Sequence, residues 1–572
     1  MEWKKFPNDF TKQYSNISSE HPYETLLTGG YQGTMETENG MHQYWVYFPE
    51  GMEYSCKHLV LLVPNSESVD AFLERTGWIE ISMKEKLLLL MAGSNEDPWL
   101  TDGEAASRLV SLNRVRNDRT YMDTQRAFSY FAAYGEGAEH GHRYVSANPA
   151  IYASAAFFGK IVMSRDELEK EGEKGTAASD IPKREVACPV CFIGLRELYP
   201  EYVIRYWRRA DKTEEKAYQQ DNMTVWLPDA AQHGSSVDHQ PVARVAWLDT
   251  ELFGKDVSQK VWERFLSKTV RATGILNDDL HPYRTEEQWG IRRKEIQIDG
   301  FRRHWYEYIP ERLAVLADDK IPVVVFFHGG SASALSGLYS HEWVQTARER
   351  GFILAMPTGT MRKQENVMPH PAWNAAGLSD HMDDEKLIRH MLADIQSRYP
   401  VDPGRIYACG HSMGAAMAQR AALAMPDIFA AAASNSGVVT GGFMGNFDTP
   451  GVRTDIPVPI WIQMGEKDVG GGTLLNNTNA ARTVHYWVTR YQLSDEDTPD
   501  CWRTGRYLNR EWKTEGGVPM VRYTTTLEKP HAITPQDPWF YYDEFFCRFS
   551  KGENGELYYK GKLVTDKNGT RL

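Results

Sequence analysis

One stretch of the sequence carries a side chain that could act as a nucleophile on a tight turn. Residues 405–426 read RIYACGHSMGAAMAQRAALAMP, which is an apolar run, the pentapeptide GHSMG (410–414) and an alanine-rich segment. The apolar run predicts a short strand and the alanine-rich segment predicts a helix, with Ser412 on the turn between them. Glycines on both sides leave room for so sharp a turn. The pattern therefore predicts a nucleophile elbow that presents the hydroxyl of Ser412.

A serine hydroxyl is a poor nucleophile unless a base removes its proton. After an elbow of this kind the acid comes next along the chain, and the histidine follows it. Two histidines follow Ser412, namely His485 and His531. His485 lies in a helical pattern, TVHYWVTRY, where packing or solvent contact is the simpler role. His531 lies in PHAITPQDPW, between a strand and an aromatic-rich helix, and we predict that it is the base.

The acid must hold the imidazole in one tautomer and stabilise its positive charge. Asp468 follows the apolar run PVPIWIQMG (457–465), so it falls just past the carboxyl end of a predicted strand. Active-site groups of open α/β sheets gather at that edge. Asp495, Asp497 and Asp500 are the alternatives, and a loop or helix-cap role is the simpler role for Asp468 itself. We predict that Asp468 is the acid.

Charge that develops on an attacked carbonyl oxygen needs backbone N–H donors. The N–H of Met413, at the start of the predicted helix, is one predicted donor. The segment FHGGS (327–331) ends another apolar run, and its residues Gly329 and Gly330 let the backbone approach a substrate. We predict that these glycines supply the second donor. Three further side chains are expected beside the substrate: His411, Trp373 and Ser331.

The strands and helices that must position these groups form a repeating pattern. Short apolar runs bounded by Gly, Pro or Asn alternate with helical patterns, which indicates a doubly wound α/β fold with a mostly parallel sheet. The pattern occurs twice, because HQYWVYFPEG (42–51) resembles RHWYEYIPER (303–312). In both halves this segment precedes two apolar runs with the same spacing. The chain of 572 residues is also too long for one hydrophobic core.

We therefore predict two tandem domains, 1–285 and 286–572, joined near 273–290, where the periodicity lapses. The first domain lacks the chemistry. Alignment of the repeats places Gly137 where the second half has its serine, and Pro64, which has no N–H, in the glycine loop. We expect this half to be a scaffold, with a wall of the active-site entrance as the alternative.

Composition excludes several functions. A formal net charge of −13 disfavours nucleic acid or an anionic membrane as partner. No run approaches the roughly 18 apolar residues of a membrane span, and the N-terminus lacks a signal-peptide core. We expect a cytoplasmic protein, and a secreted form with a removed leader stays open. The single CxxC at 188–191 and the absence of a phosphate-binding GxxxxGK[ST] motif predict neither metal nor cofactor.

Residues 290–550 resemble the polyhydroxybutyrate-depolymerase and feruloyl-esterase-like branch of the α/β hydrolases. The features that carry the resemblance are HGG at 328–330, Trp373-Asn374, Asp383-Asp384, VDPGRIYACGHSMGAAMA at 401–418, PDIFAAAASNSG at 426–437, and the GEKD and PHAITPQDPW segments. The resemblance implies that Ser412, Asp468 and His531 form the triad, and that the Asp383-Asp384 pair fixes the surroundings of the elbow. The chain departs from the family at Ala415, where many members carry a further glycine.

The resemblance implies two tandem α/β-hydrolase-like domains and a serine-dependent carboxylic ester hydrolase that works through an acyl-enzyme. Its substrate would be a small-molecule or oligomeric ester of a hydroxyalkanoate, an aromatic (feruloyl-like) acid or a short acyl group. A serine peptidase or an acyltransferase on the same fold is one alternative. A non-catalytic binding protein is another, and a homo-oligomer is possible in each case.

Overall fold

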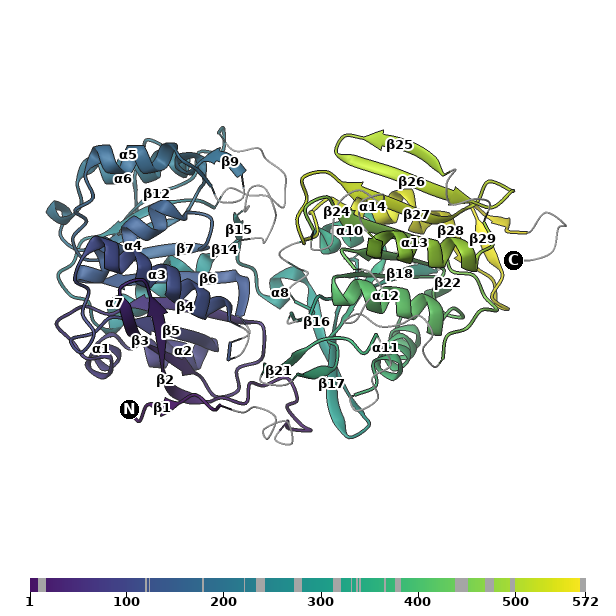
Figure 1. Cartoon of the computed structure of the whole chain (residues 1–572), viewed down its shortest axis with the longest axis horizontal. Coiled ribbons are helices and arrows are strands. Elements are labelled where there is room, and N and C mark those ends of the chain that lie inside the picture. Colours follow the sequence, from purple (N-terminus) through teal and green to yellow (C-terminus); the bar gives the residue numbers. More distant parts are fainter. Residues whose placement is uncertain are drawn as a thin grey trace. The chain divides into compact units, whose positions relative to one another are not determined.

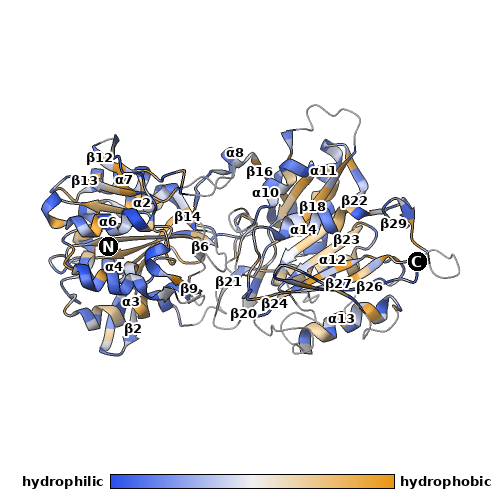
Figure 2. Cartoon of the chain, turned by 90° about the horizontal axis from the view of Figure 1, so that it is seen from above, coloured by the Kyte–Doolittle hydropathy of each residue, from blue (hydrophilic) through white to orange (hydrophobic). Residues whose placement is uncertain are grey.

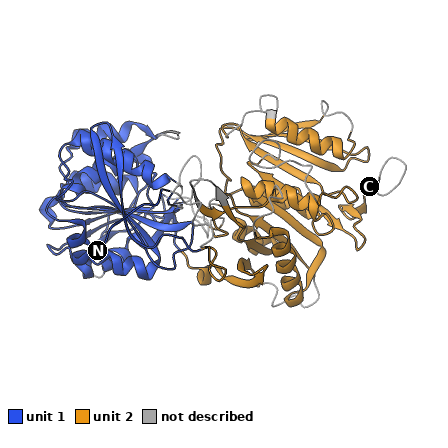
Figure 3. Ribbon diagram, turned by 60° about the horizontal axis from the view of Figure 1, so that its bottom comes forward, with its two compact units in different colours: residues 1–16, 24–283, 364–368 blue, residues 17–23, 284–363, 369–572 orange. Residues whose placement is uncertain are grey.

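The computed structural model describes residues 1–8, 17–118, 121–122, 124–176, 179–220, 222–232, 242–271, 280–311, 320–330, 332–335, 338, 341–364, 367–375, 382–437, 451–468, 478–493 and 499–565. Contacts divide the chain into two compact units, which Figure 3 colours separately. Unit 1 comprises Met1–Asn16, Glu24–Tyr283 and Gln364–Met368, and unit 2 comprises Ile17–Tyr23, Arg284–Lys363 and Pro369–Leu572. Along the chain, the long segment of unit 1 ends at Tyr283 and the first long segment of unit 2 begins at Arg284.

Unit 2 is built on one twisted sheet whose middle strands are parallel. In spatial order its strands are β16 (Ile291–Ile298), β17 (Phe301–Tyr308), β19 (Ile353–Pro357), β18 (Ile321–Phe327), β22 (Val401–His411), β23 (Ala431–Asn435), β24 (Ile460–Gly465), β27 (Pro519–Thr526), β26 (Tyr507–Lys513) and β25 (Asp500–Thr504). Its helices are α8 (Glu286–Trp289), α10 (Trp343–Arg350), α11 (Asp384–Arg398), α12 (Met413–Ala424), α13 (Thr478–Arg490) and α14 (Asp537–Glu544).

Unit 1 has a sheet of the same kind. In spatial order its strands are β1 (Lys4–Lys5), β2 (Gly29–Thr37), β3 (Gly40–Phe48), β5 (Leu87–Ala92), β4 (Cys56–Leu62), β6 (Thr124–Tyr134), β7 (Ser154–Phe158), β10 (Val190–Ile193), β13 (Val245–Leu248), β12 (Met223–Trp226) and β11 (Tyr218–Gln220). Its helices are α1 (Val69–Thr76), α2 (Trp78–Glu85), α3 (Asp102–Asn117), α4 (Glu136–Ala147), α5 (Arg165–Glu173), α6 (Glu201–Ala210) and α7 (Lys255–Arg264).

The remaining strands form small sheets outside these two. They pair β8 (Gly175–Thr176) with β9 (Ser179–Pro182), β14 (Thr269–Arg271) with β15 (Leu280–Pro282), β20 (Met361–Gln364) with β21 (Val367–Pro371), and β28 (Phe549–Lys551) with β29 (Leu557–Tyr559) and β30 (Lys562–Leu563).

The two large sheets correspond strand by strand. From β2 in unit 1 and from β16 in unit 2, two antiparallel pairings lead into five parallel ones, and two antiparallel pairings close the sheet. Counted from β2 and from β16, the third and fourth strands in space are swapped relative to chain order in both sheets. The α/β fold expected from the apolar runs is confirmed in each unit.

The cores follow from these layers. The central strands β5, β7, β18 and β19 are buried over their whole length, as expected for parallel strands covered on both faces. Figure 2 shows orange strands inside each unit, whereas a surface helix such as α3 is largely blue. In unit 1 the same view places α2 and α7 on one side of the sheet and α3 and α4 on the other (Figures 1 and 2).

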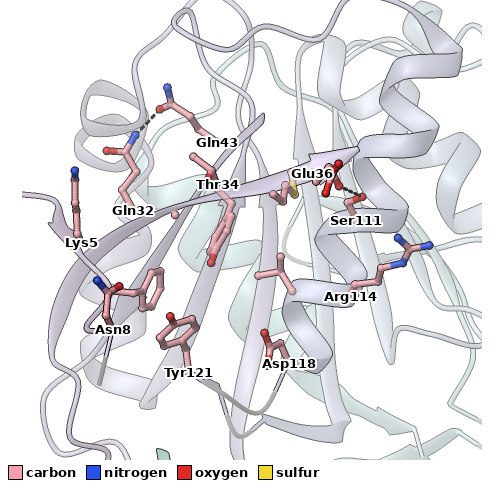
Figure 4. Close-up of a pocket in the computed structure, with 15 residues that line it drawn as sticks. Lys5, Asn8, Gln32, Thr34, Glu36, Gln43, Ser111, Arg114, Asp118 and Tyr121 are labelled. Carbon is pink, nitrogen blue, oxygen red and sulfur yellow. Dashed lines mark hydrogen bonds between the residues drawn. The ribbon is translucent and has the colours of Figure 1, made fainter. Parts of the chain in front are cut away.

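An open groove of about 920 Å³ lies on unit 1, where side chains from β2, β3 and α3 line it (Figure 4). It contains none of the residues that the sequence predicts as catalytic. Across the described part of the chain, no helix combines the length and the apolar character that a membrane crossing requires.

Candidate active site

The predicted elbow forms where β22 runs into α12. Ser412 adopts φ 55° and ψ −117°, a backbone conformation that residues other than glycine rarely adopt. Its N–H donates to the carbonyl oxygen of Asn435 at 2.9 Å, and its own carbonyl accepts from the N–H of Ala415 at 3.0 Å. Both hydrogen bonds hold the strained turn in place, because the surrounding backbone fixes it from two sides.

The glycines of the elbow are required by close backbone contacts. A Cβ on Gly410 would overlap the carbonyl oxygen of Gly414, and a Cβ on Gly414 would overlap the carbonyl oxygen of Phe327 in β18. Both obstacles are backbone atoms, which cannot rotate away as a side chain can. The first turn of α12 therefore packs directly against the end of β18.

Substitution of Gly414 by alanine is expected to destabilise the protein by about 1–3 kcal/mol, the usual cost of overpacking a close contact. Denaturant unfolding followed by circular dichroism measures the change. Gly516→Ala serves as the control, because a Cβ there would meet only the side-chain oxygen of Thr514 at 3.7 Å. Equal unfolding free energies for the two variants would show that the close approach at Gly414 has been misread.

The structure brings Ser412, His531 and Asp468 together in the predicted order. The Nε2 atom of His531 lies 2.9 Å from the Oγ of Ser412, and its Nδ1 lies 2.6 Å from the Oδ1 of Asp468. Since a carboxylate can only accept, Nδ1 carries the proton and Nε2 is free to accept one from the serine. The Asp468 side chain is fully buried, whereas 39% of the imidazole surface is exposed.

The charge of Asp468 is stabilised by the histidine. Burial raises the pKa of this carboxyl group, but the hydrogen bond and charge of His531, together with Ser436 and the charge of Lys529, outweigh burial and leave the pKa below its usual value. The acid therefore stays ionised near neutral pH. An ionised, buried carboxylate on Nδ1 is what an imidazole needs in order to take up a second proton at Nε2.

The glycine loop after β18 lies beside the elbow. A Cβ on Gly329 would be 3.6 Å from the Cβ of Ser412, and a Cβ on Gly330 would be 2.6 Å from the Sδ of Met413. The N–H of Met413 is in the first turn of α12, where N–H groups lack an intrahelical partner. The three predicted oxyanion donors thus belong to two adjacent segments.

A buried histidine holds this loop. The Nε2 of His328 accepts from the N–H of Gly359 at 3.0 Å, so its Nδ1 donates to the carbonyl oxygen of Gly329 at 2.6 Å. Burial lowers the pKa of His328 to about 4, which keeps the ring neutral. The indole N–H of Trp373 donates to the carbonyl oxygen of His328 at 2.7 Å. In the sequence His328 is visible only as part of the HGG motif, which does not reveal its supporting role.

The other predicted site residues have different surroundings. His411 lies next to the base, with its ring centroid 5.0 Å from that of His531. Trp373 is only 4% exposed, so its indole supports the glycine loop from within rather than facing a substrate. That position differs from the expected one, because the indole N–H is used by the backbone. Ser331 lies outside the described residues.

The alternatives for acid and base lie elsewhere. Asp500 is exposed on β25 and pairs with Lys513 at 2.6 Å. His485 is an exposed residue of α13, the helix that the sequence predicts for it. Asp495 and Asp497 lie outside the described residues.

The Asp383-Asp384 pair anchors the segment before α11. The side chain of Asp383 caps the helix by accepting from the N–H of Lys386 at 3.0 Å. Asp384 is buried and binds Arg303 at 2.7 Å, and it also accepts from the N–H of Asn374 at 2.7 Å. The pair therefore fixes the loop that carries Trp373, and neither carboxylate belongs to the relay.

In unit 1 the turn equivalent to the elbow corrects the sequence alignment. Gly135 has φ 56° and ψ −128°, almost the angles of Ser412, and its N–H donates to the carbonyl oxygen of Phe158 at 2.9 Å. Gly135 rather than Gly137 therefore stands at the serine's place. The alignment was wrong by two residues because the sequence around this turn offers no anchor other than glycine. The conclusion that this position has no hydroxyl is unchanged.

The neighbours of Gly135 also leave little room for a side chain at this position. A Cβ on Gly135 would lie 2.7 Å from the Cβ of Pro64. The N–H of Asn65, in the loop that corresponds to the glycine loop, donates to the carboxylate of Glu136 at 3.1 Å. The indole N–H of Trp99 donates to the carbonyl oxygen of Val63, as Trp373 does in unit 2.

Sequence reasoning missed a set of buried polar residues near the triad. They are Asn435, Gln463, Lys529, Asp537 and Tyr541, each at most 2% exposed. The available signal was the presence of Asn435 and Gln463 in two buried, mainly apolar strands.

Comparison with known proteins shows similarity to esterases in the second half of the chain. Residues 300–514 match the family described as putative esterase. Feruloyl esterase B of Talaromyces funiculosus is 33% identical over 136 residues, which are 23% of this chain and 36% of that protein. Poly(3-hydroxyalkanoate) depolymerase C of Paucimonas lemoignei is 26% identical over 257 residues, or 41% of this chain and 59% of that protein.

The chain thus covers about a third of the feruloyl esterase and more than half of the depolymerase. Among solved structures, an acetyl xylan esterase from Aspergillus awamori aligns with 45% of this chain and 99% of its own, at 18% identity and a TM-score of 0.34. The segment matched by the esterase family includes the elbow, the glycine loop and Asp468. Unit 2 has an α/β fold, and the part of it that carries these segments is similar to the esterase family.

Proposed function

We propose that this chain hydrolyses carboxylic esters through an acyl-enzyme formed on Ser412. The observation that carries the proposal is the continuous relay from Asp468 through His531 to the serine oxygen, with distances of 2.6 and 2.9 Å. Those lengths are within the range that proton transfer from a nucleophile to a general base requires.

In the proposed mechanism Oγ of Ser412 attacks the ester carbonyl carbon while Nε2 of His531 takes the hydroxyl proton. The carbonyl oxygen becomes an oxyanion, which the backbone N–H of Met413 and the N–H groups at Gly329 and Gly330 stabilise. The histidine then gives its proton to the departing alcohol, and an acyl-serine remains. Water, deprotonated by the same imidazole, releases the carboxylic acid and restores the serine.

The acid part of the ester substrate is proposed as a range of acyl groups. The relatives are named feruloyl esterase, acetylxylan esterase and poly(3-hydroxyalkanoate) depolymerase, so they share ester hydrolysis and differ in the acid. We propose the same range here, namely aromatic, short acyl or hydroxyalkanoate esters. Turnover of acetyl, feruloyl and 3-hydroxybutyryl esters, compared with the matching amides, separates an esterase from a peptidase. Added alcohol acceptors separate hydrolysis from acyl transfer.

Covalent labelling tests the serine mechanism directly. The folded protein is expected to react with a fluorophosphonate at Ser412, and peptide mass spectrometry locates the modified residue. Because the imidazole is partly exposed, the probe can reach the site without unfolding. A folded chain that stays unlabelled would favour the alternative of a non-catalytic binding protein.

We further propose that unit 1 is a degenerate copy of the same domain, so that residues 1–285 are a scaffold and residues 286–572 are catalytic. The matching strand order and the matching elbow angles at Gly135 and Ser412 support this proposal. Glycine offers no hydroxyl at that place. The fluorophosphonate is therefore expected to modify the chain once, and a second labelled serine within unit 1 would contradict the proposal.

A further inference from the structure

A buried polar cluster lies between the segments that carry the three relay residues of unit 2. We define the cluster by five side chains: Asn435, Gln463, Lys529, Asp537 and Tyr541. They come from the ends of β23 and β24, from the loop after β27 and from α14. None of them touches the reacting atoms in the proposed mechanism, although the charge of Lys529 contributes to the lowered pKa of Asp468.

The carboxylate of Asp537 is the centre of the cluster. Its Oδ2 accepts from the side-chain amide of Asn435 at 3.0 Å and from the N–H of Thr534 at 2.8 Å, and its Oδ1 accepts from the amide of Gln463 at 2.9 Å. The hydroxyl of Tyr541 accepts from Asn435 at 2.6 Å and donates to Gln463. Every member is therefore bonded to at least one other member.

Lys529 supplies the compensating charge. Its ammonium group donates to the Oδ1 of Asn435 at 2.7 Å and lies 3.9 Å from the carboxylate of Asp537. Both charged side chains are completely buried. Desolvation lowers the pKa of Lys529, and the Asp537 carboxylate opposes that shift. Two charges have thus been taken out of water together.

The cluster reaches all three relay segments. The carbonyl oxygen of Asn435 accepts from the N–H of Ser412 at 2.9 Å. The carbonyl oxygen of Lys529 accepts from the N–H of Lys467, next to Asp468, at 3.0 Å. His531 lies in the chain between Lys529 and Thr534, both of which are bonded into the cluster. The loop that carries the base is consequently fastened on both sides of the imidazole.

Three of the five cluster positions have counterparts in unit 1. Phe158 of unit 1 corresponds to Asn435, because each pairs with the last residue of the strand that leads into the turn, β6 or β22. Ile193 corresponds to Gln463, because Ile193 pairs with Phe158 and Gln463 pairs with Asn435. Val261 of α7 corresponds to Tyr541 of α14, because the carbonyl oxygen of each accepts from the N–H of the C-cap residue of its helix.

These three positions of unit 1 are apolar and fully buried. Burying a polar or charged group costs free energy, and apolar residues of similar volume are often as stable or more stable. A sheet of the same topology therefore forms with apolar residues at the positions where unit 2 has Asn435, Gln463 and Tyr541. The polar cluster is present in the unit that has the relay.

We propose that the buried polar cluster positions the relay, and that Lys529 and Asp537 clamp the His531 loop so that its imidazole meets both Ser412 and Asp468. These five are positioning residues rather than catalytic ones, since they act through the loops that carry the reacting groups. The proposal rests on the proposed function of Ser412. It predicts that loosening the clamp lowers kcat more than it changes KM.

The test compares Lys529→Met, Asp537→Asn and the double variant K529M/D537N in the full-length chain. Misplacing a catalytic group by about 1 Å costs on the order of 10²-fold in rate, so each variant is expected to lose about 10²-fold in kcat for p-nitrophenyl acetate. KM is expected to stay within about threefold, because substrate contacts are unchanged. Each single variant leaves one buried charge unpaired and is expected to lower Tm, whereas the double variant removes both charges and regains Tm.

The double variant separates position from stability. If the clamp acts through position, Tm recovers in K529M/D537N but kcat does not. Recovery of kcat together with Tm would overturn the proposal, as would kcat within about threefold of wild type in any folded variant. If the single variants fail to fold, the double variant alone decides between these outcomes.

Arg522→Met is the matched control. Arg522 lies in β27, the strand that leads to the His531 loop, and forms a buried pair with Glu511 at 2.7 Å. This variant is expected to lower Tm while kcat stays close to wild type, and an equal loss of kcat would overturn the proposal. Wild type and Ser412→Ala are assayed alongside. Ester turnover that does not depend on Ser412 contradicts the proposed function, whereas Ser412-dependent turnover that survives in the cluster variants contradicts only the positioning role.

Discussion

Replacing Ser412 with alanine is expected to lower kcat for ester hydrolysis by about 10⁶-fold, the scale seen when a relay serine is removed. The physical reason is that the acyl-enzyme route disappears entirely, so only the oxyanion donors and substrate binding are left to assist water. Steady-state kinetics with p-nitrophenyl acetate, on protein whose folding is checked by circular dichroism, measure the effect. His531→Ala and the double variant S412A/H531A are expected to lose about as much as the single serine variant, because the two groups act as one unit.

Ser397→Ala provides the matched control for this experiment. Ser397 is an exposed serine of α11 whose hydroxyl donates only to the carbonyl oxygen of Asp394, at 2.7 Å. Its removal is expected to leave kcat unchanged. Losses that multiply in S412A/H531A would mean that the two residues act independently, which a proton relay does not permit. Substantial turnover by folded S412A would place the nucleophile elsewhere.

The three relay residues could be predicted from the sequence because each lies in a recognisable local pattern. The elbow is recognisable because a tight strand-to-helix turn demands small residues around Ser412 at fixed spacing. The base follows by elimination, since two histidines come after the serine and one of them lies in a helical pattern. Asp468 follows from its place after an apolar run. Each of these arguments uses a few neighbouring residues.

The parts that sequence reasoning missed depend on contacts between distant segments. Trp373 reads as a substrate platform, yet its indole is used by the carbonyl oxygen of His328, a partner in another loop. The polar cluster joins Asn435 to Asp537 across 102 positions in the chain, and no local pattern shows that two such residues meet.

Strand register was likewise out of reach of the sequence. Gly135 and Gly137 are both glycines in one pentapeptide, and only backbone angles and the hydrogen bond to Phe158 decide which of them is equivalent to Ser412. A slip of two residues preserves the alternation of side chains along a strand, so the apolar pattern does not penalise it. Register had to come from the paired strands.

The acid of the relay provides the second large effect, because Asp468→Asn changes the chemistry and almost none of the shape. The asparagine amide would donate where the carboxylate accepts, so Nδ1 of His531 would lose its proton and Nε2 would carry one. The histidine would then present an N–H to the Oγ of Ser412, the wrong polarity for a base. A kcat loss of about 10⁴-fold is the known scale for such a tautomer change.

Asp500→Asn, on an exposed strand, is the control and is expected to keep full activity. Kinetics on both variants decide the point: if D468N keeps wild-type kcat while folded, the carboxylate does not orient the imidazole, and the 2.6 Å contact is structural only.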